Sequence, residues 1–122
     1  MIIIDTGIWI DHLKVPEQRL AALGERLEAL VHPYVLGELA LGSLSNRAQL
    51  LKRMAGMPQP PLVRHPLVMQ MIEAEKLFST GIGYVDAHLL ASTRLLPGSR
   101  VWTRDARLHA QAKRLGVAYT PP

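Results

Sequence analysis

Several residue types and segments are missing from this chain of 122 residues. It has no cysteine, which excludes a disulfide scaffold and a thiolate metal site and fits a reducing compartment such as the cytoplasm. No uncharged run approaches the roughly 20 residues that a membrane-spanning helix needs. The apolar run at the N-terminus ends at Asp5 without basic residues before it, so we expect no secretory signal. We therefore predict a cytoplasmic protein without a membrane anchor.

The motifs of several enzyme classes are also absent. The five histidines include no pair at i, i+4 of the metalloprotease type, and there is no nucleophile elbow, P-loop or dinucleotide fingerprint. A receiver-type regulatory domain needs an acidic pair at its first strand and a lysine after its last, but the chain offers Asp5 alone and Arg104. Asp5 also begins the Asp-Thr-Gly triplet of aspartic proteases. Those proteases are β-rich, whereas most of this chain predicts helix.

Acidic residues are scarce in the C-terminal part of the chain. The formal net charge is +4. After Asp86 the only acid is Asp105, against six basic residues: Arg94, Arg100, Arg104, Arg107, Lys113 and Arg114. Such a segment is either a solvated helix face or a surface for a polyanion such as nucleic acid.

Hydrophobic periodicity predicts an alternation of short strands and amphipathic helices. Hydrophobic residues make up 48% of the chain, enough for the core of one domain, which we expect to span residues 1–122. Apolar runs predict strands at residues 1–4, 31–32, 62–64, 101–103 and 117–119. Helical spacing and helix-start signals predict helices at 7–14, from Pro16 through a leucine repeat to Leu30, from Pro33, at 46–54, from Pro66, from Asp86, and at 106–115. This order predicts an α/β fold, a three-layer α/β/α sandwich with a short, mostly parallel central sheet.

Four acids occupy special positions in this pattern. Asp5 and Asp105 follow predicted strands, and Asp86 begins a predicted helix. Chemistry in open α/β sheets collects at the carboxyl ends of the strands. Glu38 has apolar residues one turn before it on its helix, where a buried carboxylate needs a partner or a cation.

Each acid also has a purely structural interpretation. Asp86 and Asp105 are natural helix N-caps, Asp5 can close a turn, and Glu38 can reach solvent or an arginine. If the four converge, mutual repulsion requires protonation or a neutralising cation. Hard oxygen ligands without cysteine favour Mg²⁺, with Mn²⁺ as the alternative. The hydroxyls of Thr6 and Thr103 stand beside two of the acids and can orient a carboxylate or cap a helix.

Four stretches of the sequence resemble the PIN-domain ribonucleases, and most closely the VapC-type toxins of toxin–antitoxin pairs. They are IIDTGIWIDHL (residues 3–13), VLGELALG (35–42), GYVDAHLLAS (83–92) and VWTRDARL (101–108). Each stretch alone is weak, but the four come in family order and span essentially the whole chain. Some members carry a further acid after the last aspartate, where this chain has His109.

The resemblance implies a metal-dependent endoribonuclease with Asp5, Glu38, Asp86 and Asp105 as its acidic site. It also implies a homodimer, a VapB-type antitoxin that blocks the site, and operator DNA bound only through the antitoxin complex. Residues 44–68 match no family motif and are expected to carry specificity for RNA or antitoxin.

We hypothesise that Asp5 and Asp86 hold the principal metal, with Glu38 and Asp105 completing its shell, and that a metal-activated water attacks the phosphodiester. Arg100, Arg104 and Arg107 are candidates for contacts with the RNA backbone. The alternative is a module with a PIN-like fold that binds RNA or protein without cutting.

Overall fold

The computed structural model describes all 122 residues and has a small parallel sheet at its centre. Strand β1 (Ile2–Ile4) lies between β2 (Ala29–Leu30) and β3 (Arg100–Trp102), in the order β2-β1-β3. Ile3 pairs with Leu30 on one side and with Val101 on the other. All of β1 is buried, as expected for a β-branched apolar run in a sheet covered on both faces.

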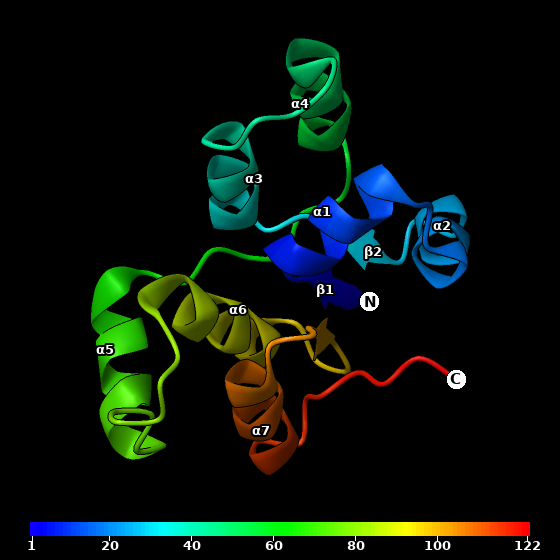
Figure 1. The fold of residues 1–122 in the computed structure, drawn as a ribbon. Helices are drawn as coiled ribbons and strands as arrows, with labels where there is room; N and C mark the ends of the chain where they lie inside the picture. The colour runs from blue at the N-terminus through cyan, green and yellow to red at the C-terminus, as the bar shows by residue number, and fades with distance from the viewer.

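Seven helices surround the sheet and complete the α/β/α sandwich (Figure 1). They are α1 (Thr6–Lys14), α2 (Gln18–Glu25), α3 (Pro33–Ala40), α4 (Arg47–Ala55), α5 (His65–Ala74), α6 (Tyr84–Leu95) and α7 (Ala106–Arg114). In Figure 1, helices α5, α6 and α7 lie below β1, whereas α3 and α4 lie above it. The predicted fold class is therefore confirmed, with a sheet that is wholly parallel.

The core is one cluster of 26 buried hydrophobic residues drawn from all three strands and all seven helices. Helix α6 is the most deeply buried helix, with every residue from 87 to 93 inside the protein. It therefore fixes the position of its own first turn, which carries Asp86. None of the helices has the length and apolar character needed to cross a membrane.

The first half of the chain differs from the prediction around the second helix. The leucine repeat predicts one helix through Leu30, but α2 ends at Glu25 and Leu27 has a φ of +57°. This left-handed residue turns the chain, so Leu30 enters the sheet instead of a helix. The strand predicted at 31–32 lies two residues earlier, because His32 is already the N-cap of α3.

Two further predicted strands are wrong in whole or in part. Residues 62–64 form no strand, and the segment follows Pro60 and Pro61, which have no N–H to donate to a sheet. Residues 117–119 contribute a single parallel bridge, between Ala118 and Val101. Tyr119 N–H still donates to the carbonyl of Val101, at 2.9 Å, so the segment extends the edge of the sheet beside β3.

The parallel arrangement brings the carboxyl ends of the three strands to one edge of the sheet. Asp5 follows β1 directly, and its N–H donates to the carbonyl of Trp102 in β3 at 2.9 Å. His32 follows β2 and begins the helix that carries Glu38. Thr103 follows β3 and precedes Asp105. The candidate side chains therefore emerge at a common edge.

Candidate active site

Asp5 is held by hydrogen bonds from two directions. It is the N-cap of α1, and its Oδ1 accepts from the backbone N–H of Thr6 at 2.8 Å. Its Oδ2 accepts from the buried hydroxyl of Thr103 at 2.6 Å. The structural interpretation of Asp5 as a turn residue is thus correct in part. Because both oxygens are tied to different elements, the carboxylate has a fixed orientation at the sheet edge.

Thr103 also fixes the backbone that leads to Asp105. Its hydroxyl oxygen accepts from the N–H of Asp105 at 3.0 Å while its proton goes to Asp5. Asp105 is exposed and is the N-cap of α7, with Oδ1 accepting from Arg107 N–H at 2.9 Å and Leu108 N–H at 3.1 Å. The Oδ2 atom of Asp105 makes no such bond and stays available for a ligand.

Glu38 is exposed rather than buried on its apolar helix. Its Oε1 accepts from the hydroxyl of Thr6 at 2.7 Å, which joins α3 to the first residue of α1. Thr6 therefore links Glu38 to Asp5, because its backbone N–H and its hydroxyl serve one carboxylate each. The expected cost of burying Glu38 does not arise in this structure.

Asp86 lies inside the first turn of α6 and is not the N-cap that its position suggested. The helix begins two residues earlier, at Tyr84, and Asp86 Oδ2 accepts from the N–H of Gly83 at 3.0 Å. Burial raises the pKa of the Asp86 carboxyl, and the hydrogen bond from Gly83 opposes that rise. The negative charges of Asp5, Asp105 and Glu38 raise the pKa of Asp86 further, in that order.

All three other acids are thus close enough to act on Asp86 electrostatically, although the four acids belong to four different segments of the chain. The donor set suits a hard divalent cation, since it offers carboxylate and hydroxyl oxygens and no sulfur. As the side chains are placed, no three acidic or histidine residues stand close enough together to hold one ion.

The three arginines proposed for RNA lie in different places. Arg100 is the first residue of β3, and its N–H donates to the carbonyl of Met1, so it lies at the opposite edge of the sheet from the acids. Arg107 is exposed on the first turn of α7 and forms no ion pair. Its Cδ lies 2.6 Å from the position that a Cβ on Gly81 would take. Gly81, with a φ of +86°, thus lets Arg107 cover the loop before α6.

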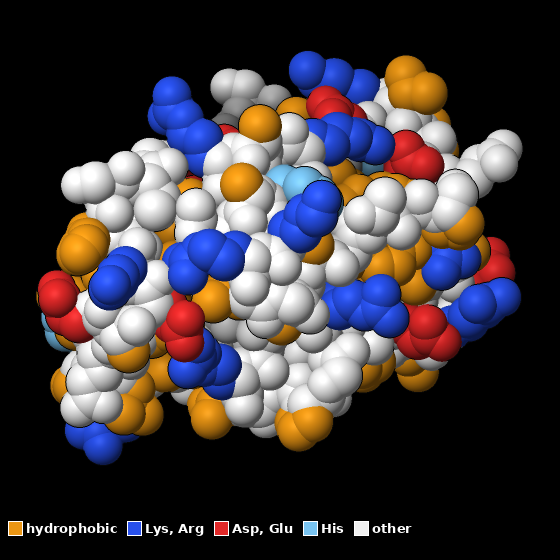
Figure 2. Space-filling view, turned by 90° about the horizontal axis from the view of Figure 1, so that it is seen from below, with side chains coloured by type: hydrophobic (Ala, Val, Ile, Leu, Met, Phe, Trp, Pro, Cys, Tyr) orange, Lys and Arg blue, Asp and Glu red, His pale blue; other side chains and the backbone are white.

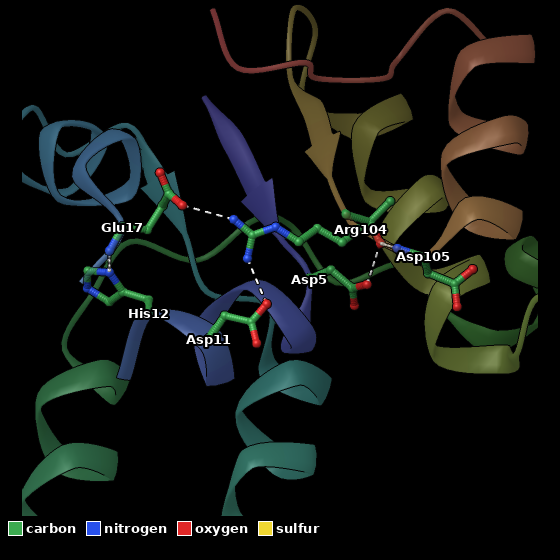
Figure 3. Close-up of polar contacts among 7 residues, drawn as sticks. Asp5, Asp11, His12, Glu17, Arg104 and Asp105 are labelled. Atoms are coloured by element: carbon green, nitrogen blue, oxygen red, sulfur yellow. Dashed lines mark hydrogen bonds and ion pairs between the residues drawn. The ribbon is translucent and has the colours of Figure 1, made fainter. Parts of the chain in front are cut away.

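Arg104 is engaged by two carboxylates, as Figure 3 shows. Its Nη1 lies 2.7 Å from Asp11 Oδ2 and its Nη2 lies 2.9 Å from Glu17 Oε2. These pairs connect α1 and the segment before α2 to the turn that carries Asp105. Arg104 thus balances acids outside the site, and its charge is less available to a ligand than that of Arg107.

Basic side chains do not gather in one patch on the face seen in Figure 2, which is the side where α5 and α7 lie in Figure 1. Figure 2 shows Lys and Arg side chains spread over this face, some of them beside carboxylates. Arg94 of α6 pairs with Glu75 at the end of α5, with Nη2 at 2.6 Å from Oε1. All six basic residues of the C-terminal segment are exposed, and Arg94 and Arg104 are paired with carboxylates.

A cluster of aromatic rings beside the acids was not anticipated from the sequence. His32 and His88 are buried, and the exposed Tyr34 and Tyr84 pack against the His88 ring. Burial lowers the pKa of His32 to about 4, aided by His88, and burial also lowers the pKa of His88, aided by His65. The available signal was spacing: Tyr84 and His88 stand four residues apart on one helix, as do Tyr34 and Glu38 on another.

Comparison with known proteins identifies close relatives. The chain is 44% identical over 118 residues to proteins named Ribonuclease VapC32 from two strains of Mycobacterium tuberculosis, CDC 1551 / Oshkosh and H37Rv. The alignment covers 97% of this chain and 95% of each relative. No family model matches the chain.

Proposed function

Because this chain belongs to the VapC family of PIN-domain ribonucleases, we propose that it is a metal-dependent endoribonuclease and the toxin of a type II toxin–antitoxin system. The observation that supports the proposal is the placement of four acids near the carboxyl edge of the sheet. Thr103 binds Asp5 there, Thr6 joins Asp5 to Glu38, and Asp5, Asp105 and Glu38 are near enough to raise the pKa of Asp86, although the side chains as placed are too far apart to hold one ion. Clustered carboxylates destabilise a fold unless a cation neutralises them, so their clustering favours a site built for a metal.

The proposed ligands fall into two pairs. Asp5 and Asp86 would hold the principal ion, with Glu38 and Asp105 completing its surroundings directly or through water. When bound, Mg²⁺ or Mn²⁺ supplies Lewis acidity that makes water a nucleophile at neutral pH and stabilises charge on the phosphodiester. The products of this hydrolysis would be a 5′-phosphate and a 3′-hydroxyl.

The threonines would act by positioning the carboxylates. Thr103 donates to Asp5 and accepts from the backbone of Asp105, so one side chain sets the spacing of two acids. Thr6 holds Glu38 in the same way from the start of α1. Such outer hydrogen bonds fix the direction of a ligand's lone pairs and lower the reorganisation needed when an ion binds.

Among the three arginines, Arg107 is the best placed to hold an RNA phosphate. It lies two residues from Asp105, covers the loop before α6 and has no carboxylate partner. Arg104 would act structurally through Asp11 and Glu17. Arg100 would contact RNA only if the substrate also reached the opposite edge of the sheet.

The antitoxin partner would dock on a groove of about 1040 Å³ between α1 and α4. Ile10, Leu13, Leu44 and Leu50 give it an apolar floor, and its basic rim consists of Lys14, Lys52 and Arg53. An amphipathic segment with acidic flanks complements this combination. Much of the groove comes from the motif-free residues 44–68, in keeping with a role in specificity.

Cytoplasmic location, homodimerisation, and operator DNA bound only through the antitoxin complex remain parts of the same proposal.

The competing function is a PIN-like module that binds RNA or protein without cutting. A binding module gains nothing from four acids that repel each other, which favours hydrolysis. The test is incubation of the purified chain with a mixed tRNA and rRNA pool in Mg²⁺, Mn²⁺ or EDTA. Cutting that requires the metal supports the enzyme. Tight RNA binding by a folded protein, without cutting in either metal, would support the binding module instead.

A further inference from the structure

Two tyrosines from different helices share one buried support. The ring of His88 lies 4.6 Å from that of Tyr34, at an interplanar angle of 70°, and 4.7 Å from that of Tyr84, at 82°. His88 is 1% exposed, and neither of its ring nitrogens has a hydrogen-bond partner. Its imidazole therefore serves as a packing surface between α3 and α6, and it holds the two tyrosine rings as near neighbours.

Each tyrosine is also fixed from a second side. Tyr34 packs against His32, with ring centroids 5.3 Å apart, and Tyr84 packs against His65 at 5.5 Å. The Tyr84 hydroxyl lies 2.5 Å from Nδ1 of His65. Rings held in this way lose little freedom when a ligand stacks on them, so they are already organised for binding.

Both tyrosines remain open to solvent although His32 and His88, against which they pack, are buried. Tyr34 is 37% exposed and Tyr84 is 43% exposed. Tyr34 precedes Glu38 by one turn of α3, and Tyr84 precedes Asp86 in the first turn of α6. The exposed rings therefore lie at the rim of the acidic site, within about one helical turn of two of its carboxylates.

Two arginines without acidic partners belong to the segments that flank Tyr84 and its partner His65. Arg64 is exposed and stands next to His65, which contacts Tyr84. Arg107 covers Gly81, three residues before Tyr84. Neither forms an ion pair with a carboxylate. Exposed aromatic rings accompanied by free cationic side chains suit single-stranded nucleic acid, because bases stack on the rings while phosphates meet the charges.

We propose that Tyr34 and Tyr84 form a stacking surface for unpaired bases beside the scissile phosphate. Bases within a duplex stack on each other and leave no free face, so this surface selects single-stranded or looped RNA and disfavours paired RNA. The role of this surface in selecting a substrate rests on the proposed ribonuclease activity. Its structural basis, two fixed and exposed aromatic faces at the acidic rim, is independent of that activity.

The test is binding of a fluorescein-labelled RNA strand of about 12 nucleotides, alone and annealed to its complement, measured by anisotropy in EDTA so that no metal-dependent cutting occurs. Tyr34→Leu and Tyr84→Leu keep apolar bulk against His88 but remove the aromatic face. Tyr34→Phe and Tyr84→Phe keep the face. Phe78→Ala is the matched control, since Phe78 is 51% exposed and contacts no other aromatic ring.

Each leucine variant should bind the single strand about ten-fold more weakly than wild type and bind the duplex almost unchanged. The phenylalanine variants should recover most of the lost affinity, and Phe78→Ala should match wild type. In cleavage assays with metal, the leucine variants should raise KM more than they lower kcat. Thermal melts of every variant establish that it is folded.

Leucine variants that bind the single strand like wild type would overturn the proposal, as would equal losses for single strand and duplex. Unchanged RNA binding with a loss of dimers in solution would also overturn it and assign the tyrosines to contact between copies. A wild-type protein that binds single strands through these tyrosines but never cuts would refute the ribonuclease proposal alone. One that cuts, with leucine variants unaffected in binding, would refute the stacking surface alone.

Discussion

The burial of His32 makes the stability of this fold depend on pH in a way that can be calculated. The side chain is 0% exposed, and its pKa falls from 6.5 to about 4, first because of burial and second because of His88. Its Nδ1 accepts the backbone N–H of Tyr34 at 3.0 Å and so caps α3. Protonation of Nδ1 would turn this acceptor into a donor and abolish the cap, which is a further reason for the imidazole to stay neutral.

The sign and size of the effect follow from the two pKa values. Above pH 6.5 the histidine is neutral in both states and contributes no pH dependence. As the pH falls from 6.5 to about 4, the unfolded chain takes up a proton that the folded chain refuses, so the free energy of unfolding decreases. The difference between these two pKa values, 6.5 and about 4, corresponds to a loss of about 3 kcal/mol in the free energy of unfolding at pH 4. Below pH 4 the loss levels off.

The assay is urea unfolding from pH 7 to pH 4, followed through the fluorescence of the buried Trp9 and Trp102. His32→Asn is the matched variant, because asparagine also caps a helix but does not titrate in this range. Wild type should lose about 3 kcal/mol more than His32→Asn between these pH values. The comparison cancels Asp86, whose raised pKa acts in the opposite direction, since its carboxylate destabilises the fold as the pH rises. Equal losses in the two proteins would refute the reasoning.

Three further predictions concern the residues around the acids. Thr103→Ala should lower the free energy of unfolding in urea by about 1 to 3 kcal/mol and reduce cleavage, because the hydroxyl binds both Asp5 and the backbone of Asp105. Thr103→Ser should retain most of the stability and the cleavage, and equal behaviour of the two variants would contradict this. Asp105→Asn should keep the N-cap of α7 and the melting temperature of the protein but lose cleavage. Asp105→Ala should lose cleavage and also about 1 kcal/mol of stability. A fully active asparagine variant would show that Asp105 is not part of the site. Arg107→Gln should make the slope of log binding constant against log salt concentration shallower by about one phosphate contact, and Arg104→Gln should leave it unchanged. RNA titrations at several salt concentrations measure this slope, and the opposite result would exchange the roles of the two arginines.

Much of the fold could be predicted from local pattern, because short apolar strands and capped amphipathic helices have distinct periods. β1, α1, α3 and α7 lie within two residues of their predicted bounds. The failure at α2 has a specific cause, since Leu27 adopts a left-handed conformation that a leucine repeat does not reveal. The two-residue β2 owes its place to pairing with Ile2 and Ile3, a long-range contact that no local pattern encodes.

The candidate site could be anticipated in its acids but not in their environment. Strand ends and the family resemblance pointed to Asp5 and Asp105, yet their link through the hydroxyl of Thr103 depends on two chain segments 98 residues apart. The ion pairs of Arg104 with Asp11 and Glu17 join residues that are 93 and 87 positions apart in sequence. The aromatic cluster was missed because its support, His88, was considered only as a packing residue on one helix.

The most direct test of the central claim is cleavage of RNA in Mn²⁺ by Asp5→Asn, compared with Asp11→Asn as the matched control. Asparagine at position 5 retains the N-cap of α1 through its amide oxygen and places an amide N–H, which can donate to the hydroxyl oxygen, against Thr103. It removes one negative charge from the site. Asp11 is an exposed acid of the same helix that pairs with Arg104 outside the site. If the four acids act together, Asp5→Asn should fold with unchanged or higher stability and lose cleavage, while Asp11→Asn cuts like wild type. A folded Asp5→Asn protein with full activity would contradict the assignment of this site.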